Sequence, residues 1–376
     1  MIKKLIKMIV ITILSIVGSL GLITIVFVNT SPQFGGKPTK AQQELYAQTG
    51  HYEEGKFVNQ IPSEMEVGLK DMPSLIYKQF KSDPDRQPRI KFPVQHIDSM
   101  EIEQKPDSIT RLTWFGHSAF LLEIAGKKIL LDPMFGDVPA PHPWLGKSRY
   151  SNGLPIEIEK LPKIDAIIMS HDHYDHLDYG SIMKLKEKTE QFYMPLGVGA
   201  HFRKWGVDDS RIHELDWWED ITLDSLTFTC TPARHFSGRG FTRANTLWSS
   251  WVIQSPEKNI YFSGDSGYGP HFKKIGEKFG SFDYAMMECG QYNEKWQAIH
   301  MMPEETIQAA IDINAQITQP IHWGAFTLSL HSWTDPIERA TKEANRLDVK
   351  LCTPAIGEPV LIGQSYPAEQ WWTNFK

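Results

Sequence analysis

The sequence predicts an α+β protein, an αββα sandwich of two face-to-face β-sheets with helices on the outer sides, preceded by an N-terminal transmembrane helix. Two observations carry this prediction. From residue 109 onward, short apolar runs typical of strands alternate with amphipathic segments typical of helices. Residues 8–28 are 21 consecutive uncharged, mostly apolar positions. We therefore expect an anchor over 1–30, a linker and wrapping extension over 31–108, and a main domain over 109–376.

The composition suits a large globular domain. The chain has 376 residues, of which 41% are hydrophobic, enough for a substantial core. A net charge of −6 does not favour nucleic-acid binding, which requires clustered lysine and arginine. Cys230, Cys289 and Cys352 are scattered without a paired framework, so we expect packed, free thiols.

The N-terminal apolar segment is long enough to cross a bilayer. As a helix it would extend about 31 Å, close to the thickness of the hydrocarbon core. Lys3, Lys4 and Lys7 precede it, and the next basic residue is Lys37. The positive-inside rule then places the N-terminus in the cytoplasm and the main domain on the extracytoplasmic side of the membrane. A cleaved signal peptide is the competing interpretation, but its apolar region would be shorter and would end at an Ala-x-Ala-like site.

Local patterns predict the remaining elements. The extension is rich in Pro, Gly and polar residues, with a helix-like patch near Lys40–Gln48. Three strands are expected at the start of the main domain, at Thr110–Phe115, Ala119–Ile124 and Lys128–Leu131. Helices are expected at Tyr179–Lys188, Gly197–Trp205, Pro270–Phe279, Pro303–Ile313 and Pro336–Leu347.

A histidine-rich segment follows a predicted buried strand, Ile164–Met169. It holds His171, His173, Asp175 and His176 within six residues. Because alternate side chains of an extended chain point the same way, His171 and His173 can share one metal ion. Asp175 and His176, beyond the bend, can then face a second ion. A solvated loop is the alternative interpretation.

Three further candidate ligands repeat the same design, in which a strand is followed by a turn and then by a polar side chain. They are His235 after Leu226–Thr231, Asp265 after Asn259–Ser263, and His322 after Ile317–Pro320. Imidazole and carboxylate are ligands that zinc accepts readily, and paired metals form a recognised hydrolytic arrangement. A purely structural role for His235 or a turn role for Asp265 stays open for each residue taken alone.

The ordered set HxHxDH followed by distant His, Asp and His resembles the metallo-β-lactamase superfamily. Within it, residues 111–363 resemble the N-acylphosphatidylethanolamine-hydrolysing phospholipase D family. That likeness is carried by HYDHLDY, PLG (195–197), ELDWWE (214–219), GDSGY (264–268), IGEKFGSFD (275–283) and IHWGAF (321–326). The resemblance implies the αββα fold and a hydrolase domain over 109–376.

The resemblance also implies two Zn²⁺ ions per chain that activate a water molecule. We assign the first ion to His171, His173 and His235, the second to Asp175, His176 and His322, and the bridging position to Asp265. Asp175 and Asp265 are the expected catalytic carboxylates. The metal environment also permits iron or manganese.

Four other residues receive expected roles around the ligands. Asp132 and His117 end strands on the metal side, and both are expected to lie around the ligands without binding the metal. The resemblance favours Asp132 as a partner of a ligand histidine, although a turn aspartate explains it almost as well from sequence. His300 and His331 lie in loops near the late ligands, where each could contact the substrate or simply be exposed.

These features predict a membrane-anchored dinuclear zinc hydrolase of a lipid phosphodiester. The resemblance favours N-acylphosphatidylethanolamine, cleaved to an N-acylethanolamine and phosphatidic acid. Two departures are the anchor, which mammalian members lack, and a shorter loop at Gly290–His300. The alternatives are a hydrolase of a small soluble ester, lactone or phosphodiester, and a non-catalytic membrane-tethered binding protein. The expected partners are a phospholipid and the membrane, with no nucleic acid; a homodimer and the acyl-chain preference stay open.

Overall fold

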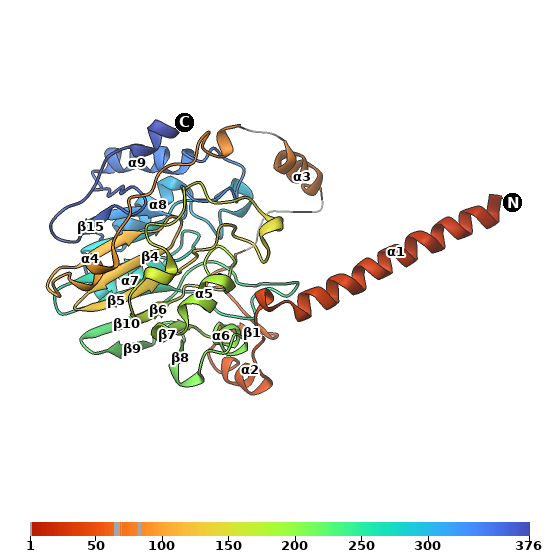
Figure 1. Cartoon of the computed structure of the whole chain (residues 1–376), viewed down its shortest axis with the longest axis horizontal. Coiled ribbons are helices and arrows are strands. Elements are labelled where there is room, and N and C mark those ends of the chain that lie inside the picture. Colours follow the sequence, from red (N-terminus) through yellow and green to blue (C-terminus); the bar gives the residue numbers. More distant parts are fainter. Residues whose placement is uncertain (1, 64–67, 69, 82–83) are drawn as a thin grey trace.

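Two β-sheets form the centre of the structure, a computed structural model that describes residues 2–63, 68, 70–81 and 84–376 (Figure 1). The larger sheet has the strand order β15-β3-β4-β5-β6-β7-β8. Neighbours are antiparallel from β15 to β5 and parallel from β5 to β8. Its strands are β3 (Arg111–Trp114), β4 (Phe120–Ile124), β5 (Lys127–Leu131), β6 (Ile164–Ile168), β7 (Thr189–Pro195), β8 (Ile212–Leu215) and β15 (Pro359–Leu361).

The second sheet has the order β14-β13-β12-β11-β10-β9. It is antiparallel from β9 to β12 and parallel from β12 to β14. Its strands are β9 (Asp220–Leu223), β10 (Leu226–Thr231), β11 (Ser250–Gln254), β12 (Asn259–Phe262), β13 (Tyr284–Glu288) and β14 (Thr318–Ile321). Each sheet therefore combines antiparallel and parallel pairs.

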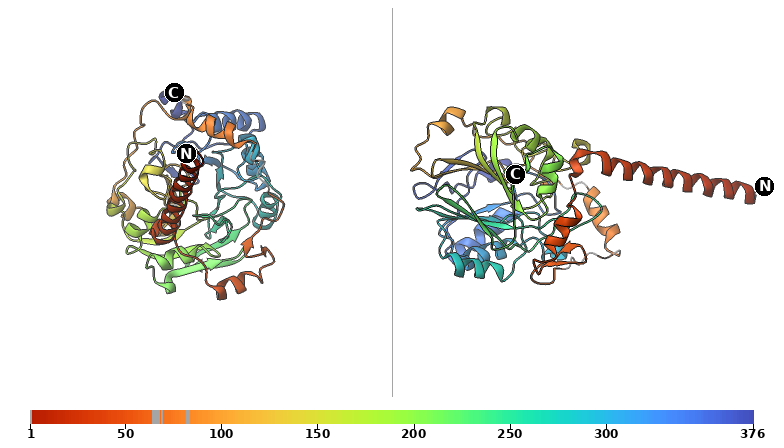
Figure 2. Two further views of the ribbon diagram at one scale, coloured as in Figure 1. Left: turned by 90° about the vertical axis from the view of Figure 1, so that its right-hand side faces the viewer. Right: turned by 90° about the horizontal axis from the view of Figure 1, so that it is seen from below.

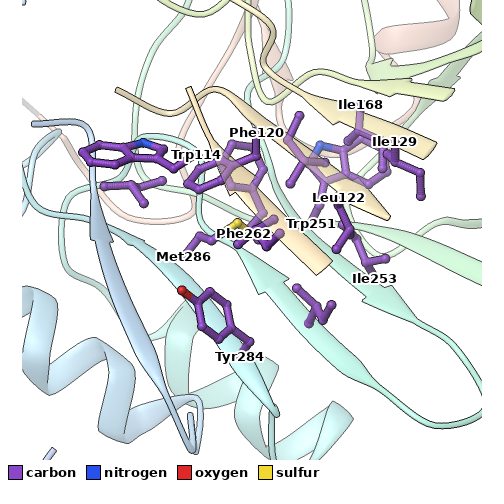
Figure 3. Packing of buried hydrophobic residues seen from close by; sticks show 14 of the residues in the cluster. Trp114, Phe120, Leu122, Ile129, Ile168, Trp251, Ile253, Phe262, Tyr284 and Met286 are labelled. Atoms are coloured by element: carbon purple, nitrogen blue, oxygen red, sulfur yellow. The ribbon is translucent and has the colours of Figure 1, made fainter. Parts of the chain in front are cut away.

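The main hydrophobic core lies between the two sheets (Figure 3). Phe120 and Leu122 of β4 face this core, whereas Leu121 between them belongs to a separate cluster on the outer face. This alternation is the two-residue period of a strand. The second sheet contributes Trp251 and Phe262, and all of these side chains are buried. Strands covered on both faces are mostly apolar, as in β4 (FLLEI) and β6 (IDAII), each of which has a single acidic residue.

Helices cover the outer faces of both sheets. The larger sheet carries α5 (Tyr179–Leu185) and α6 (Gly199–Lys204), which bury Ile182, Leu185 and Phe202 against it. The second sheet carries α7 (His271–Phe279) and α8 (Pro303–Asp312), and α9 (Asp335–Leu347) packs on α8 through Ala340. The predicted αββα architecture is thus confirmed.

The N-terminal extension runs over the surface of the main domain. Its elements are α2 (Lys40–Tyr46), β1 (Tyr52–Glu53), β2 (Lys56–Phe57), α3 (Met72–Phe80) and α4 (Ser99–Glu103). Phe57 N donates to Ala244 O at 2.9 Å, and Gln95 N donates to Ile356 O at 2.8 Å. These hydrogen bonds join segments far apart in sequence, so the extension is packed onto the domain at both positions.

The first helix, α1 (Ile2–Thr30), projects away from the domain (Figures 1 and 2). None of its residues is fully buried, and only Phe27 and Val28, near its end, are partly buried. Its length and apolar composition are sufficient to cross a membrane, a criterion that a signal sequence also meets. The helix is therefore a candidate membrane anchor.

Candidate metal centre

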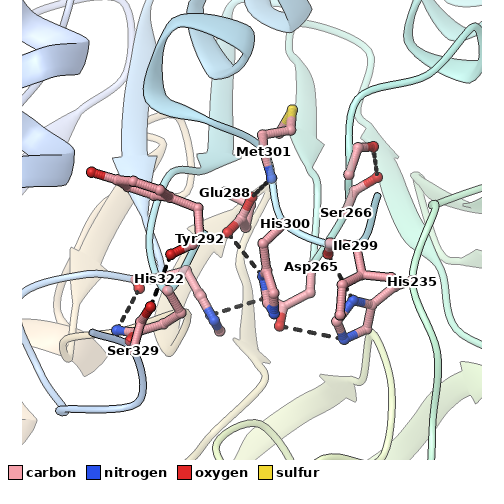
Figure 4. Close-up of polar contacts among 12 residues, drawn as sticks. His235, Asp265, Ser266, Glu288, Tyr292, Ile299, His300, Met301, His322 and Ser329 are labelled. Carbon is pink, nitrogen blue, oxygen red and sulfur yellow. Dashed lines mark hydrogen bonds and ion pairs between the residues drawn. The ribbon is translucent and has the colours of Figure 1, made fainter. Parts of the chain in front are cut away.

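Loops at the ends of several strands meet at one edge of the two sheets. Strand β6 leads into the histidine-rich loop, and loops after β10, β12 and β14 carry His235, Asp265 and His322. Figure 4 shows these last three side chains pointing toward one another. The sheets are joined at this edge, because Ser249 N donates to Ser170 O at 2.9 Å. Strands β6, β12 and β14 belong to parallel pairs, whose carboxyl ends lie at the same edge. Strand β10 runs in the same direction as β12, because both are antiparallel to β11.

One group of ligand atoms consists of the side chains of His171, His173, His235 and Asp265, which lie within 4.8 Å of one another. His173 Nδ1 lies 2.9 Å from His171 Nε2 and 3.2 Å from His235 Nε2. Asp265 Oδ2 lies 3.8 Å from His171 Nε2 and 3.7 Å from His235 Nε2. Three imidazole nitrogens and a carboxylate oxygen are a set that suits one zinc-like cation.

A second group contains His117, Asp175, His176 and His322, also within 4.8 Å. Asp175 Oδ2 lies 3.6 Å from His176 Nε2 and 3.8 Å from His322 Nε2. His117 Nε2 is the nearest neighbour of that oxygen, at 2.8 Å. The sequence placed His117 outside the ligands, whereas the structure places its ring nitrogen among the ligand atoms.

Asp265 faces both groups with different oxygens. Its Oδ2 faces the first group, and its Oδ1 lies 3.2 Å from His176 Nε2 and 3.0 Å from His322 Nδ1. A carboxylate in this position is suited to bridge two cations. The structure thus brings all seven expected ligands together from four separated segments.

Hydrogen bonds outside the groups fix the orientation of ligand rings. His176 Nδ1 lies 2.7 Å from Asp132 Oδ2, and His235 Nδ1 donates to Ile299 O at 2.9 Å. Ser170 N and Oγ both donate to Asp132, at 2.7 and 2.5 Å. When Nδ1 carries the proton, Nε2 has a free lone pair for a cation. Asp132 therefore occupies the position that the family resemblance favoured.

Three residues at this edge have a strained backbone conformation. His117, Asp132 and His322 have φ of 55°, 37° and 66°, in the left-handed region that costs non-glycine residues about 1 kcal/mol. Gly264, just before Asp265, has φ of 55°, and a Cβ there would lie 2.6 Å from Ser170 Cβ. The site is held in a conformation that local sequence preferences do not favour.

The electrostatics of the groups fit bound cations. Burial lowers the pKa of His171, His235 and His322, the last to about 3, so these imidazoles are neutral. Burial, the largest influence, raises the pKa of Asp265 and Asp175, but the neighbouring histidines together, led by His176, outweigh it and hold both pKa values well below their usual range. Against the effect of its burial, the same carboxylates raise the pKa of His176. Neutral imidazoles and ionised carboxylates are the forms that bind metals.

Three buried atoms in the centre lack hydrogen-bond partners among the described residues. They are His117 Nδ1, His176 Nε2 and Asp265 Oδ1. A buried polar atom without a partner is costly unless a cation satisfies it. Together with the donor set and the charge pattern, these atoms show that the residues fit one or more divalent cations.

His300 lies beside the centre, held by a carboxylate that sequence reasoning missed. A ring nitrogen of His300 lies within 4.8 Å of ligand atoms of Asp265 and His322. Its Nδ1 is 3.2 Å from Glu288 Oε1, and Glu288 Oε2 accepts from Met301 N at 3.0 Å (Figure 4). Burial raises the pKa of Glu288 to about 7. Its position directly at the end of β13 is the same strand-end signal that revealed the ligands.

His331 lies in a different environment. Its ring stacks on Tyr292 with centroids 4.4 Å apart, and Nδ1 donates to Ser332 O at 2.8 Å. Among the described residues, His331 belongs to none of the groups of clustered ligand atoms. A substrate contact by His331 would therefore occur away from the ligands.

A buried arginine, Arg239, supports the histidine-rich loop. Arg239 Nη1 donates to Asp172 O at 2.7 Å, within the histidine-rich turn, and to Leu177 O at 2.6 Å, just after it. Its Nη2 donates to Gln33 O at 2.7 Å, just beyond α1. Asp172 itself accepts from Gly238 N at 2.7 Å. These contacts join segments distant in sequence, and no local pattern would have revealed them.

Comparison with known proteins agrees with this geometry. Residues 127–323 match the model of the beta-lactamase superfamily domain. An uncharacterized protein of Mycobacterium tuberculosis is 38% identical over 91% of this chain and 92% of its own length. The N-acyl-phosphatidylethanolamine-hydrolyzing phospholipase D 1 of Caenorhabditis elegans is 34% identical over 57% of this chain and 64% of its own. The crystal structure of an isothiocyanate hydrolase from Delia radicum gut bacteria superposes with a TM-score of 0.53 at 23% identity, covering 66% of this chain and 98% of that one.

The fold and the clustered histidine and aspartate ligands define a metal-dependent hydrolase. This chain belongs to the metallo-β-lactamase superfamily, as predicted. Its relation to the phospholipase D branch extends over about 60% of the chain.

Proposed function

We propose that this protein is a membrane-anchored, dinuclear zinc phosphodiesterase of the phospholipase D type that hydrolyses N-acylphosphatidylethanolamine. The observation that carries the proposal is the bridging position of Asp265 between two groups of ligand atoms. His171, His173 and His235 would hold one ion, and Asp175, His176 and His322 the other. Bound zinc would supply Lewis acidity to the phosphoryl group and lower the pKa of water at the site.

Asp175 is the carboxylate suited to handle the proton of the attacking water. With 15% of its side chain exposed, it is more accessible than Asp265, which has 2% exposed. His117 Nε2 lies 2.8 Å from Asp175 Oδ2, which fixes the orientation of the carboxylate. A positioned carboxylate can accept a proton during the attack on phosphorus.

His300 is suited to the leaving-group side. Its ring lies between those of His235 and His322, with centroid distances of 5.0 and 5.3 Å. The buried carboxylate of Glu288 raises the pKa of His300 by hydrogen bonding, against the opposing effect of burial, which is the largest influence. A protonated imidazole beside the reacting phosphate can donate to the departing oxygen. Glu288 is then a positioning residue.

A cavity of about 400 Å³ opens beside His235 and supports a lipid substrate. Its lining is largely apolar and includes Phe57, Phe236 and Trp248, with Arg243 as a cation. Phe57 comes from the N-terminal extension, so the extension forms part of the wall. An apolar cavity with one basic residue is suited to an acyl chain attached to an anionic headgroup.

The location follows from α1. Its apolar helix would hold the protein in the membrane, and the lysines at its start would place the catalytic domain on the extracytoplasmic side. Retention of α1 predicts that the intact protein stays with membranes after high-salt and carbonate washing. Clean release by these washes would remove the anchor from the proposal.

Lipid mass spectrometry tests the activity. Membranes containing N-acylphosphatidylethanolamine are incubated with the purified full chain and with His173→Ala as the inactive control. Release of N-acylethanolamine and phosphatidic acid by the wild type alone supports the proposal. Short water-soluble diesters and lactones are offered in parallel, and turnover of these without lipid turnover would instead establish a hydrolase of soluble substrates.

Asp175→Asn tests the catalytic assignment. The amide cannot accept the proton, so turnover should fall by a factor of about 10²–10⁴. Zinc content is measured on the same sample by mass spectrometry of the metal. A variant with full zinc and full activity would exclude Asp175 from catalysis.

A further inference from the structure

Aromatic side chains of the domain surround the point where α1 joins it. The ring of Phe27, near the end of α1, lies 5.0 Å from His142 and 6.3 Å from Trp144. On another side, Val28 and Phe241 line the same cavity of about 330 Å³. Two loops of the main domain therefore reach the level at which the apolar run of α1 ends.

This face exposes an unusual set of apolar side chains. In the part of the chain that the structure describes, Phe241, Trp144 and Tyr77 are the most exposed aromatic residues, with 75, 72 and 67% exposed. Leu145 beside Trp144, and Met72 and Ile76 on the helix that carries Tyr77, are also exposed. That helix, α3, lies on the side of the domain from which α1 projects (Figures 1 and 2).

We propose that Trp144, Phe241 and Tyr77, with these neighbours, insert into the interfacial layer of the bilayer that holds α1. This inference rests on the proposed function, because it requires α1 to be embedded. Tryptophan and tyrosine concentrate at the headgroup level of membranes, where one side of the ring is apolar and the other is wet. Since the apolar run of α1 ends at Val28, its neighbours Trp144 and Phe241 lie at the same level as the membrane surface.

Contact with water alone does not explain these exposed apolar side chains. Large exposed apolar areas on a protein surface mark interaction sites, and three separate segments contribute exposed apolar side chains on this side of the domain. Their common feature is proximity to the base of α1 or to the side from which it projects. A bilayer is the one partner that a transmembrane α1 necessarily brings to this face.

The same face lies next to the metal centre. Phe34, in the turn after α1, has its ring 5.6 Å from Phe27 and 6.3 Å from Tyr174. Tyr174 lies between the ligands His173 and Asp175. Seating this face on the bilayer therefore brings the metal-binding loop to the lipid surface, so that a phospholipid can reach the centre without crossing bulk water.

Site-directed fluorescence on the full chain tests the inference. The native cysteines, Cys230, Cys289 and Cys352, are buried, so a cysteine introduced at the surface can be labelled selectively with the fluorophore NBD. Trp144→Cys and Phe241→Cys are labelled and reconstituted into phosphatidylcholine vesicles carrying a nitroxide on the headgroup. We expect a blue-shifted emission and strong quenching at both positions. Solvent-like emission without quenching at both would overturn the inference.

Two further labelled positions distinguish a failure of the interfacial contact from a failure of the membrane anchor. Met100→Cys, on α4 at the side of the domain away from α1, should remain solvent-like (Figure 1). Ile16→Cys, inside α1, should be quenched by a nitroxide deep in the acyl chains. If position 16 is quenched while 144 and 241 are not, only the interfacial contact fails. If position 16 is itself unquenched, the membrane anchor of the proposed function fails, and the inference fails with it.

Kinetics supply a second readout. Replacing Trp144, Phe241 and Tyr77 together by serine should raise the KM for N-acylphosphatidylethanolamine in vesicles by about tenfold, because the variant loses apolar contact with the lipid. Turnover of the same lipid dispersed in detergent micelles should be unchanged, because none of the three is a proposed ligand. An unchanged vesicle KM would contradict the interfacial role, and circular dichroism checks that the variant is folded.

Discussion

His176 and Asp132 form a fully buried pair in which the imidazole Nδ1 lies 2.7 Å from Oδ2 of the carboxylate. The same carboxylate accepts two hydrogen bonds from Ser170, the first residue of the metal-binding loop. Asp132 therefore orients a ligand ring and fixes the start of the loop at once. Such partners set the basicity of the ligand as well as its direction.

Asp132→Asn should weaken metal binding while leaving the ligands in place. An amide is a poorer acceptor for Nδ1–H, and loss of such partners costs about 10–100-fold in metal affinity. Competition with a fluorescent zinc chelator measures the change. Asp137→Asn, at a carboxylate that is 84% exposed, is the matched control and should bind zinc like the wild type. Equal affinity in the Asp132 variant would show that the pair does not support the metal.

Glu288→Gln should lower kcat with little change in KM. Glutamine keeps the size and one of the two hydrogen-bond acceptors of Glu288 but removes the charge that supports protonation of His300. We expect a fall in kcat of about 10–100-fold and an alkaline limb of the pH profile shifted to lower pH. Glu294→Gln, in the following loop, serves as the control. An unchanged pH profile would limit Glu288 to a structural role.

Arg239→Met should destabilise the folded domain. The change leaves carbonyl oxygens of Asp172, Leu177 and Gln33 without their donor in a buried position, for a loss of about 3–5 kcal/mol in the free energy of unfolding. Urea denaturation with a fluorescence readout measures it. The exposed Arg243→Met offers the same chemical change and should stay within about 0.5 kcal/mol of the wild type. Equal stability of both variants would contradict the role assigned to Arg239.

His271 should contribute to acid sensitivity. Burial lowers its pKa to about 3, so below its ordinary value of 6.5 the unfolded chain binds a proton that the folded chain does not. The contribution of neutral His271 to the free energy of unfolding is therefore fully present above pH 6.5. It is lost as the pH falls toward about 3, by at most about 1.4 kcal/mol per pH unit. His271→Gln should flatten the fall in unfolding free energy between neutral pH and about pH 5 relative to the wild type. Parallel pH curves for the two proteins would exclude this contribution.

Local patterns in the sequence were sufficient for the sandwich and for the positions of its elements. Strand β10 appears at the predicted Leu226–Thr231, and α8 begins at the predicted Pro303. Both follow from the period of apolar residues and from helix-start chemistry, which are properties of neighbouring residues. Strand-end positions likewise predicted where the seven candidate ligands would meet.

Contacts between segments distant in sequence could not be predicted from local patterns. The sequence placed His117 outside the ligands, and its entry among them depends on how the turn after β3 packs against the histidine-rich loop. The link from Arg239 to Gln33 depends on where the extension crosses the domain. Asp132 could be identified only through family resemblance, since an aspartate before a proline is also a common turn residue.

The dependence of hydrolytic activity on the number of bound zinc ions tests the central claim, a dinuclear zinc centre, most directly. The purified full chain is stripped with a chelator, verified metal-free by elemental mass spectrometry, and titrated with zinc while hydrolysis of N-acylphosphatidylethanolamine is followed. We expect no activity in the stripped protein, full recovery at two zinc ions per chain, and failure of Asp265→Ala to recover. Undiminished hydrolysis by the verified metal-free protein would contradict the account.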